Sequence, residues 1–389
     1  MYFISEIDPN YRIKGSRDPL GFQSIWSAAG HKAIKHLSTV SVNLKDFMVL
    51  SYGLFFYGER DSRGFLNFFY KFEQACAFAR HIHNGENSFN GIEFVIKNKD
   101  KNEFSFSTRP SDTLLSNQRS YGVYGKYIRP YRDMAIKNDP DFYPVLETSL
   151  EKTDRTFLND FIANLLNEDI SKVTKEDLKC LSDLFGKITP EEKIFYRDHI
   201  LKLPGENHPQ NTLYDLLKNN EDILKFENFQ LHSLIDTLTG LKNNEGKLVD
   251  ALKFIQHTDR VLHPVNRIFS YLLSKSSWTI KQIEEDELIN SIDSNQNYIF
   301  NEPTLRHLNS ILKSNNLDMV NEIIIRNEKV SKSRGNQPWI IKERKNNTYK
   351  ILYGENGQKI DRIDTDNQHE FPYFLDSYLS LYKQIELES

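Results

Sequence analysis

The segment that most constrains the fold spans residues 44–57 and contains the apolar run FMVLSYGLFFY. A helix that is apolar on every side has to be covered on every side by protein. Asn43 can cap such a helix, because its side chain accepts a hydrogen bond from an otherwise unpaired helical N–H. A buried strand is the alternative interpretation of the run. Both interpretations require a sizeable core around this segment.

Helices are also predicted before and after this run. Asp18-Pro19 indicates a helix start, and apolar residues follow at roughly helical spacing as far as residue 37. A third helix is predicted from about residue 64 to residue 83, with Gly85 at its C-cap. Bulky apolar side chains from all three helices are expected to share one core, because only a shared core can cover so many of them. They are Trp26, Leu37, Phe47, Phe55, Phe68 and Phe72.

Strand patterns occur in two places. Residues 92–107 alternate polar and apolar side chains around a polar turn at 98–102, which predicts an antiparallel hairpin. Three helices followed by a hairpin would be compatible with a winged-helix-like arrangement and with many other small α+β domains. Residues 339–353 predict a second hairpin, in which a turn at Asn346-Asn347 would place Glu343 opposite Lys350.

The chain changes character near residue 154 and again near residue 336. Between these points helical patterns follow one another, and capping boxes at Thr189–Glu192 and Thr279–Gln282 mark two helix starts. We predict a mainly α protein with minor β (α+β), with two short antiparallel hairpins. The predicted parts are an aromatic-rich N-terminal α+β domain (1–153), a helical domain (154–335), and a hairpin plus C-terminal helix (336–389).

Composition limits the classes of function. Of 389 residues, 39% are hydrophobic and 27% charged, which is typical of a globular protein. No apolar run approaches the ~20 residues that cross a bilayer, and the first residues lack a signal-peptide pattern, so we expect a cytoplasmic protein with no membrane partner. Two cysteines cannot form a disulfide framework or a cysteine zinc site. Phosphate-loop, dinucleotide, hydrolase and H-E-x-x-H motifs do not occur, so no catalytic role and no cofactor are predicted.

One acidic motif supports an enzyme as an alternative. Glu343 and Lys345 follow the start of a predicted strand, and Glu328 lies upstream. In metal-dependent nucleases carboxylates hold a divalent ion and a lysine stabilises charge. This alternative takes Glu328, Glu343 and Lys345 as its catalytic candidates and needs Mg²⁺. The competing interpretation is an ordinary cross-strand charge pair between Glu343 and Lys350.

Three local basic segments point to nucleic acid, although the net charge of −4 argues against a molecule that is positive all over. Residues 12–18 place cations before a helix N-terminus, residues 116–132 alternate cations with tyrosines, and residues 327–350 form a basic stretch around Gly335 and Pro338. Cations neutralise phosphates, and tyrosines stack on unpaired bases. The candidate contacts are Arg12, Lys14, Arg17, Arg119, Tyr121, Tyr124, Lys126, Arg129, Arg132, Lys332 and Arg334.

Each basic segment also has a structural interpretation. The tyrosines could pack in the core with the arginines facing solvent. The stretch at 327–350 could be a solvated face, and residues 12–18 a capped turn with Arg17 paired to a carboxylate such as Glu73. Charge is roughly +3 before residue 154 and roughly −7 after it, so an acidic helical region could dock other proteins.

The phrases GSRDPLGFQSIWSAAGHKAIKHLSTVS, FYKFEQACAFARH and LSNQRSYGVYGKY, in this order, resemble an uncharacterised bacterial family associated with restriction and phage-defence gene neighbourhoods. The resemblance covers roughly residues 12–132 and implies no catalytic residue. It implies a non-catalytic, nucleic-acid-associated or scaffolding subunit of a bacterial anti-phage defence complex. Its partners would be the other subunits and DNA or RNA. A metal-dependent nuclease and a pure protein-interaction adaptor are the alternatives.

Overall fold

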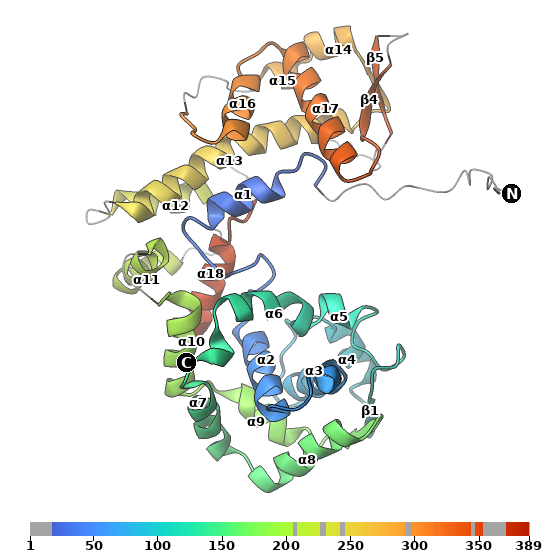
Figure 1. Ribbon diagram of the computed structural model, residues 1–389, viewed down its shortest axis with the longest axis vertical. Helices are drawn as coiled ribbons and strands as arrows, with labels where there is room; N and C mark the ends of the chain where they lie inside the picture. The colour runs from blue at the N-terminus through green and yellow to red at the C-terminus, as the bar shows by residue number, and fades with distance from the viewer. Residues whose placement is uncertain are drawn as a thin grey trace, which may run out of the picture. The chain divides into compact units, whose positions relative to one another are not determined.

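The structure is a computed structural model that describes residues 18–204, 208–225, 231–241, 246–291, 298–343, 347–352 and 371–388 (Figure 1). It is mainly α with minor β, as predicted, and its strands form two small antiparallel sheets. The chain groups into two compact units. Unit 1 comprises residues 1–32 and 228–373, and unit 2 comprises residues 33–227 and 374–389. Each unit combines stretches that are distant in sequence, so this grouping runs across the predicted boundaries at 153 and 335.

Unit 2 is built around α2 (Leu44–Tyr57) and α3 (Phe65–Ile82), and Figure 1 shows several other helices of the unit around them. Both helices were predicted. The Asn43 side chain accepts a hydrogen bond from the Lys45 N–H at 2.9 Å, and Gly85 has a φ of +70° just after α3. The other helices of this unit are α4 (Ile92–Asn98), α5 (Gln118–Tyr121), α6 (Val123–Asp133), α7 (Phe142–Ser149), α8 (Arg155–Asn167), α9 (Lys179–Gly186), α10 (Pro190–Tyr196), α11 (Pro209–Asn219) and α18 (Leu375–Tyr382).

The predicted hairpin at 92–107 is wrong. Residues 92–98 form α4, and only β1 (Glu103–Phe106) is a strand. It pairs antiparallel with β2 (Ser171–Thr174), and Phe104 faces Val173. Ile92, Val95 and Ile96 follow the helical spacing of three and four, while Ile92, Phe94 and Ile96 follow the alternation that is typical of a strand. The winged-helix-like arrangement with which a hairpin here would have been compatible is therefore not formed by residues 92–107.

Unit 1 has the long helix α13 (Lys247–Leu272) at its centre. Its other helices are α1 (Gln23–Gly30), α12 (Leu231–Gly240), α14 (Ile280–Glu284), α15 (Glu287–Asn290), α16 (Pro303–Ile311) and α17 (Asn316–Ser333). The predicted helix start at Asp18-Pro19 is wrong, because α1 begins at Gln23 and the Asp18 carboxylate accepts the Phe22 N–H at 2.7 Å in the turn before it. The helix ends at Gly30 and does not reach residue 37.

The expected shared core of six bulky side chains is only partly correct. Leu37, Phe47, Phe68 and Phe72 are buried in unit 2, and Phe55 is half-buried there. Trp26 belongs to the core of unit 1, where its ring stacks on Phe371 with centroids 6.3 Å apart. The chain passes from unit 1 to unit 2 between residues 32 and 33, so Trp26 belongs to a different unit from the other five side chains.

The second predicted hairpin is confirmed, and a third strand joins it. β4 (Ile340–Glu343) pairs with β5 (Thr348–Ile351), and β3 (Ser277–Thr279) pairs with the other edge of β5, giving the order β3-β5-β4. The predicted opposition of Glu343 and Lys350 is wrong, because Glu343 faces Thr348 and Lys350 faces Ile341. The connection spans residues 344–347 instead of a two-residue turn; Asn347 has a φ of +52°, and Asn346 lies outside the described residues.

The helices of unit 1 and the strands of its sheet alternate along the chain. The helix α13 leads into β3, then α14 and α15 follow, and α16 and α17 are joined by residues 312–315 as a helix-turn-helix. The hairpin β4–β5 follows, and its second strand pairs with β3. Among the described residues, four helices therefore lie between β3 and the hairpin, and the second strand of the hairpin lies in the middle of the sheet. Figure 1 shows the hairpin beside α17, against which β4 packs.

Candidate nucleic-acid interface

The C-terminal end of α17 is held in place by hydrogen bonds to distant parts of unit 1. The Asn327 side chain is fully buried, donates to the Pro19 carbonyl at 2.9 Å and accepts the Trp339 N–H at 2.8 Å. Arg334 donates to the Asp18 carboxylate at 3.0 Å. The end of α17, the turn before α1 and the approach to β4 therefore form one fixed substructure.

Cations lie on this substructure and on the adjoining hairpin, and we name the set of Lys329, Lys332, Arg334, Lys342 and Lys350 the basic end. Lys342 Nζ lies 3.4 Å from the Asn321 side-chain oxygen, in the N-terminal half of α17. Lys329 and Lys332 are exposed on α17, while Lys342 and Lys350 are exposed on β4 and β5. Lys342 lies over the Tyr349 ring, with Nζ 5.4 Å from its centroid. The charge of Arg334 is partly compensated by Asp18. The sequence adds Arg344 and Lys345 between the two strands, outside the described residues.

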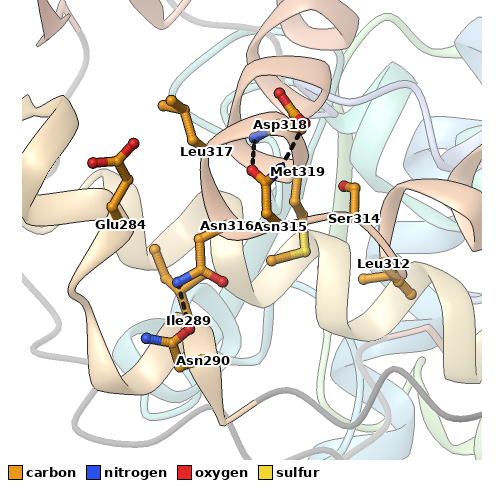
Figure 2. A pocket seen from close by; sticks show the side chains of 10 residues that line it. All are labelled: Glu284, Ile289, Asn290, Leu312, Ser314, Asn315, Asn316, Leu317, Asp318 and Met319. Carbon is orange, nitrogen blue, oxygen red and sulfur yellow. Dashed lines mark hydrogen bonds between the residues drawn. The ribbon is translucent and has the colours of Figure 1, made fainter.

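The N-terminal end of α17 has the opposite character. Asn315 caps the helix by accepting the Asp318 N–H at 2.9 Å. A cleft of about 530 Å³ opens there between the α14–α15 segment and the turn that precedes α17 (Figure 2). Across it the Asn316 amide donates to the Asn290 side chain at 2.8 Å. The charged side chains that line it are Glu284 and Asp318. These two carboxylates repel phosphate, whereas Lys329 and Lys332 near the other end of α17 attract it.

The tyrosine segment, residues 116–132, lies in unit 2, and its four rings differ in how far they are buried. Tyr127 and Tyr131 are buried, so the core interpretation holds for them, and the Tyr127 hydroxyl accepts the Asn43 N–H at 3.1 Å. The Tyr124 ring is half-buried, with its centroid 5.9 Å from those of two phenylalanine rings of α3. Tyr121 is 48% exposed, so of these four rings it is the one most open to a base.

The cations of this segment lie on the solvent side. Arg119 is exposed on α5, Arg129 and Arg132 are exposed on α6, and Lys126 is half-buried. A spacing of three along α6 keeps Lys126, Arg129 and Arg132 within about 120° of the helix circumference. Arg129 Nε lies 3.8 Å from an Asp133 carboxylate oxygen. The segment thus offers a short cationic stripe with one exposed aromatic ring.

A buried charged cluster in unit 2 was not predicted from the sequence. Arg80 donates to Asp46 at 2.7 Å and to Glu86 at 2.9 Å, with Arg80 and Asp46 almost fully buried. Glu73 is buried beside them, and its carboxylate accepts the Val123 N–H at 2.6 Å and the Gln118 amide at 2.8 Å. The signal that could have revealed it is the spacing of seven between Glu73 and Arg80, which places both charges on one face of an apolar helix.

Burial raises the pKa of Glu73 to about 7, and the nearby Asp46 contributes in the same direction. The hydrogen bonds from Val123 and Gln118 oppose this rise, as does the Arg80 charge. Glu73 fixes the start of α6 on α3, because it satisfies an N–H at the first turn of that helix. We therefore interpret Glu73 as a structural group that positions the tyrosine segment.

The nuclease candidates lie on separate elements. Glu328 is exposed on α17, Glu343 is half-buried in β4, and Lys345 lies outside the described residues. Within the part of the chain that the structure describes, no group of three or more His, Cys, Asp or Glu side chains could hold a metal ion. Arg12, Lys14 and Arg17 also lie outside the described residues. Asp18, which follows them, caps the turn before α1.

The comparisons with known proteins found no matching family model, no matching curated protein and no matching solved structure. Among the described helices, none has the length and apolar character needed to cross a membrane.

Proposed function

We propose that this chain is a nucleic-acid-binding protein and that unit 1 binds through its basic end. One observation carries the proposal: four exposed lysines lie on the hairpin and on α17, against which the hairpin packs. The major groove of DNA admits an α-helix or a two-stranded β-ribbon, and lysine is suited to neutralising phosphate. The rigid attachment of this end, through Asn327 and Arg334, supports a preformed binding surface.

The biological setting is a further part of the proposal. A non-catalytic subunit of a bacterial anti-phage defence complex is supported by the sequence resemblance alone. The tyrosine segment of unit 2 is proposed as a separate contact for single strands, through Tyr121 and the cations of α6. The exposure of Tyr121 and of Arg129 supports this second contact.

The full chain should bind labelled duplex or single-stranded DNA or RNA in a fluorescence anisotropy titration at about 50 mM salt, where phosphate contacts are strongest. Binding should weaken when Lys332 and Lys350 are both replaced by alanine. The matched control is Lys253→Ala, because Lys253 is exposed near the opposite end of α13 from β3. A wild-type protein that binds none of these probes would refute the proposal and favour the adaptor alternative.

Single-strand binding tests the second contact independently. Tyr121→Ala should cost about 1–3 kcal/mol of single-strand affinity if the ring stacks on a base, with the melting temperature unchanged. Tyr124→Ala is the contrasting variant, because its ring packs on Phe65 and Phe69 and its removal should lower the melting temperature. Unchanged affinity in Tyr121→Ala would remove this contact from the proposal.

A further inference from the structure

We infer that residues 2–8, which lie outside the described residues, dock into an apolar groove on unit 1. The groove has a volume of about 710 Å³ and is lined by α1, α13 and the residues that lead into and begin α16. This contact within the chain does not depend on the proposed function. The apolar side chains that line the groove are Ile25, Ala28, Ala29, Phe254, Ile299 and Leu305.

The groove offers apolar surface that is open to solvent. Ile25 and Phe254 pack on the core of unit 1, and Leu305 is buried. Ile299 is 93% exposed, which makes it the most exposed large apolar side chain among the described residues. A single exposed isoleucine is ordinary, but this one adjoins a groove whose volume lies within the roughly 300–1,000 Å³ of typical ligand pockets. An apolar segment bound here would remove this surface from water, which is favourable.

Residues 2–8 have the apolar character that this groove requires. Their large apolar and aromatic side chains are Tyr2, Phe3, Ile4 and Ile7, four in a stretch of seven residues. The other long segment outside the described residues, 353–370, has only three such side chains in eighteen residues. Of these two segments, the first therefore gains more from leaving water.

The segment also joins the structure beside the groove. It leads into Asp18, whose carboxylate accepts the Phe22 N–H just before α1, and α1 itself forms one wall of the groove. The ten residues from Asp8 to Asp18 can span up to about 33 Å, whereas the eight residues of α1 cover about 12 Å. Residues 2–8 can therefore reach the whole wall. A tether of this length gives a local concentration on the order of millimolar, so weak contacts are sufficient for docking.

The charges of the segment and of the groove are complementary. Residues 2–8 contain Glu6 and Asp8 and no lysine or arginine. The groove presents Lys32, which is exposed and whose Nζ lies 4.6 Å from the centroid of the Phe254 ring. The lining also contains the carboxylate of Glu302, but this group caps α16 by accepting a backbone N–H of its first turn. Lys32 is therefore placed to attract the acids of the segment.

Photo-cross-linking in the full chain tests the contact. Photoreactive benzoylphenylalanine replaces Ile299, whose exposure allows a larger side chain. After irradiation and trypsin digestion, mass spectrometry should find position 299 joined to the peptide of residues 1–12 from the same molecule. This peptide is defined by Arg12, the first lysine or arginine in the sequence.

The matched position for the photoreactive group is Leu352, which is 38% exposed on the same unit. Its N–H donates to the Trp339 carbonyl, and Asn327 bonds both to the Trp339 N–H and to the Pro19 carbonyl. Leu352 is therefore linked to the point where the segment joins unit 1. A segment held only by its tether at Asp18 would reach Leu352 at least as easily as the groove. Docking predicts a several-fold higher yield of the cross-link from position 299.

Substitutions in the segment show whether apolar contact is the cause. Phe3→Asp with Ile4→Asp should lower the yield from position 299 several-fold, because charged side chains are costly to bury. The control Asn10→Asp adds charge outside residues 2–8 and should leave the yield unchanged. An unaltered yield in the double variant would overturn the inference, as would equal yields from positions 299 and 352 or no cross-link to residues 1–12. A product of twice the mass would assign the groove to a second copy of the chain and would also overturn it.

Discussion

Glu73 should make unit 2 less stable as the pH rises toward neutrality. Its side chain is buried on α3, and both carboxylate oxygens accept hydrogen bonds from the α5–α6 segment. Burial raises its pKa from 4.5 to about 7 in the folded protein. The unfolded chain releases this proton near the ordinary pKa of glutamate, at about 4.3.

The sign follows from which state holds more protons. Between about pH 4.5 and pH 7 the folded state keeps the Glu73 proton and the unfolded state has released it, so the free energy of unfolding falls as the pH rises. A shift of about 2.5 pKa units at about 1.4 kcal/mol per unit corresponds to about 3.5 kcal/mol in total. Between pH 5 and pH 8 the decrease should be about 2 to 3 kcal/mol, because a little of it has occurred before pH 5.

Glu73→Gln isolates this effect, because glutamine has nearly the same size and does not titrate. Urea unfolding of both proteins from pH 5 to pH 8 should be followed by circular dichroism, since all three tryptophans lie in unit 1 and report only on it. The wild-type free energy of unfolding minus that of the variant should fall by about 2 to 3 kcal/mol over this range. A difference that stays flat, or that rises with pH, would refute the reasoning.

Two stability predictions follow from close packing in unit 2. Gly53→Ala should destabilise by about 1–3 kcal/mol in urea unfolding, although alanine normally favours a helix, because its Cβ would lie 2.6 Å from the Phe69 ring; an unchanged midpoint would contradict this. Asp46→Asn should cost about 3–5 kcal/mol because it leaves the buried Arg80 charge short of a partner. The exposed pair formed by Arg63 is the control for the second prediction, and Arg63→Ala should change the midpoint very little.

The elements that were predicted correctly from sequence are those whose local signals agree. In α2 the cap at Asn43, the apolar run and the length all favour a helix, and its predicted bounds match the structure. The capping boxes at Thr189 and Thr279 are likewise observed. These features depend on a few neighbouring residues, so a single sequence is sufficient to identify them.

The failures depend on contacts between residues far apart in the chain. β1 pairs with β2, about 65 residues further on, and β3 is a three-residue strand that forms only against β5. Neither pairing leaves a local signal, and the apolar residues of 92–98 satisfy both helical and strand spacing. Trp26 looked like part of the first core because no local pattern shows where the chain passes from one unit to the other.

The candidate site shows a similar division. Exposure of the cations on α6 and α17 follows from helical periodicity, and the structure agrees for Arg129, Arg132 and Lys332. Helical periodicity does not predict which tyrosine is buried. Tyr124 packs on two rings of α3, whereas Tyr121 is 48% exposed. Packing against another element decides burial, and one sequence does not reveal that neighbour.

Net charge is a poor guide to this protein because opposite charges are kept apart. Residues 154–389 carry roughly −7, which by itself argues against a phosphate-binding surface. At physiological ionic strength, however, an exposed charge acts mainly within about 8 Å, and α17 is long enough to hold Asp318 and Lys332 about 21 Å apart. The sign of the charge near Lys332 then matters more than the sum over the chain, so a net charge of −4 is compatible with the proposed phosphate contact there.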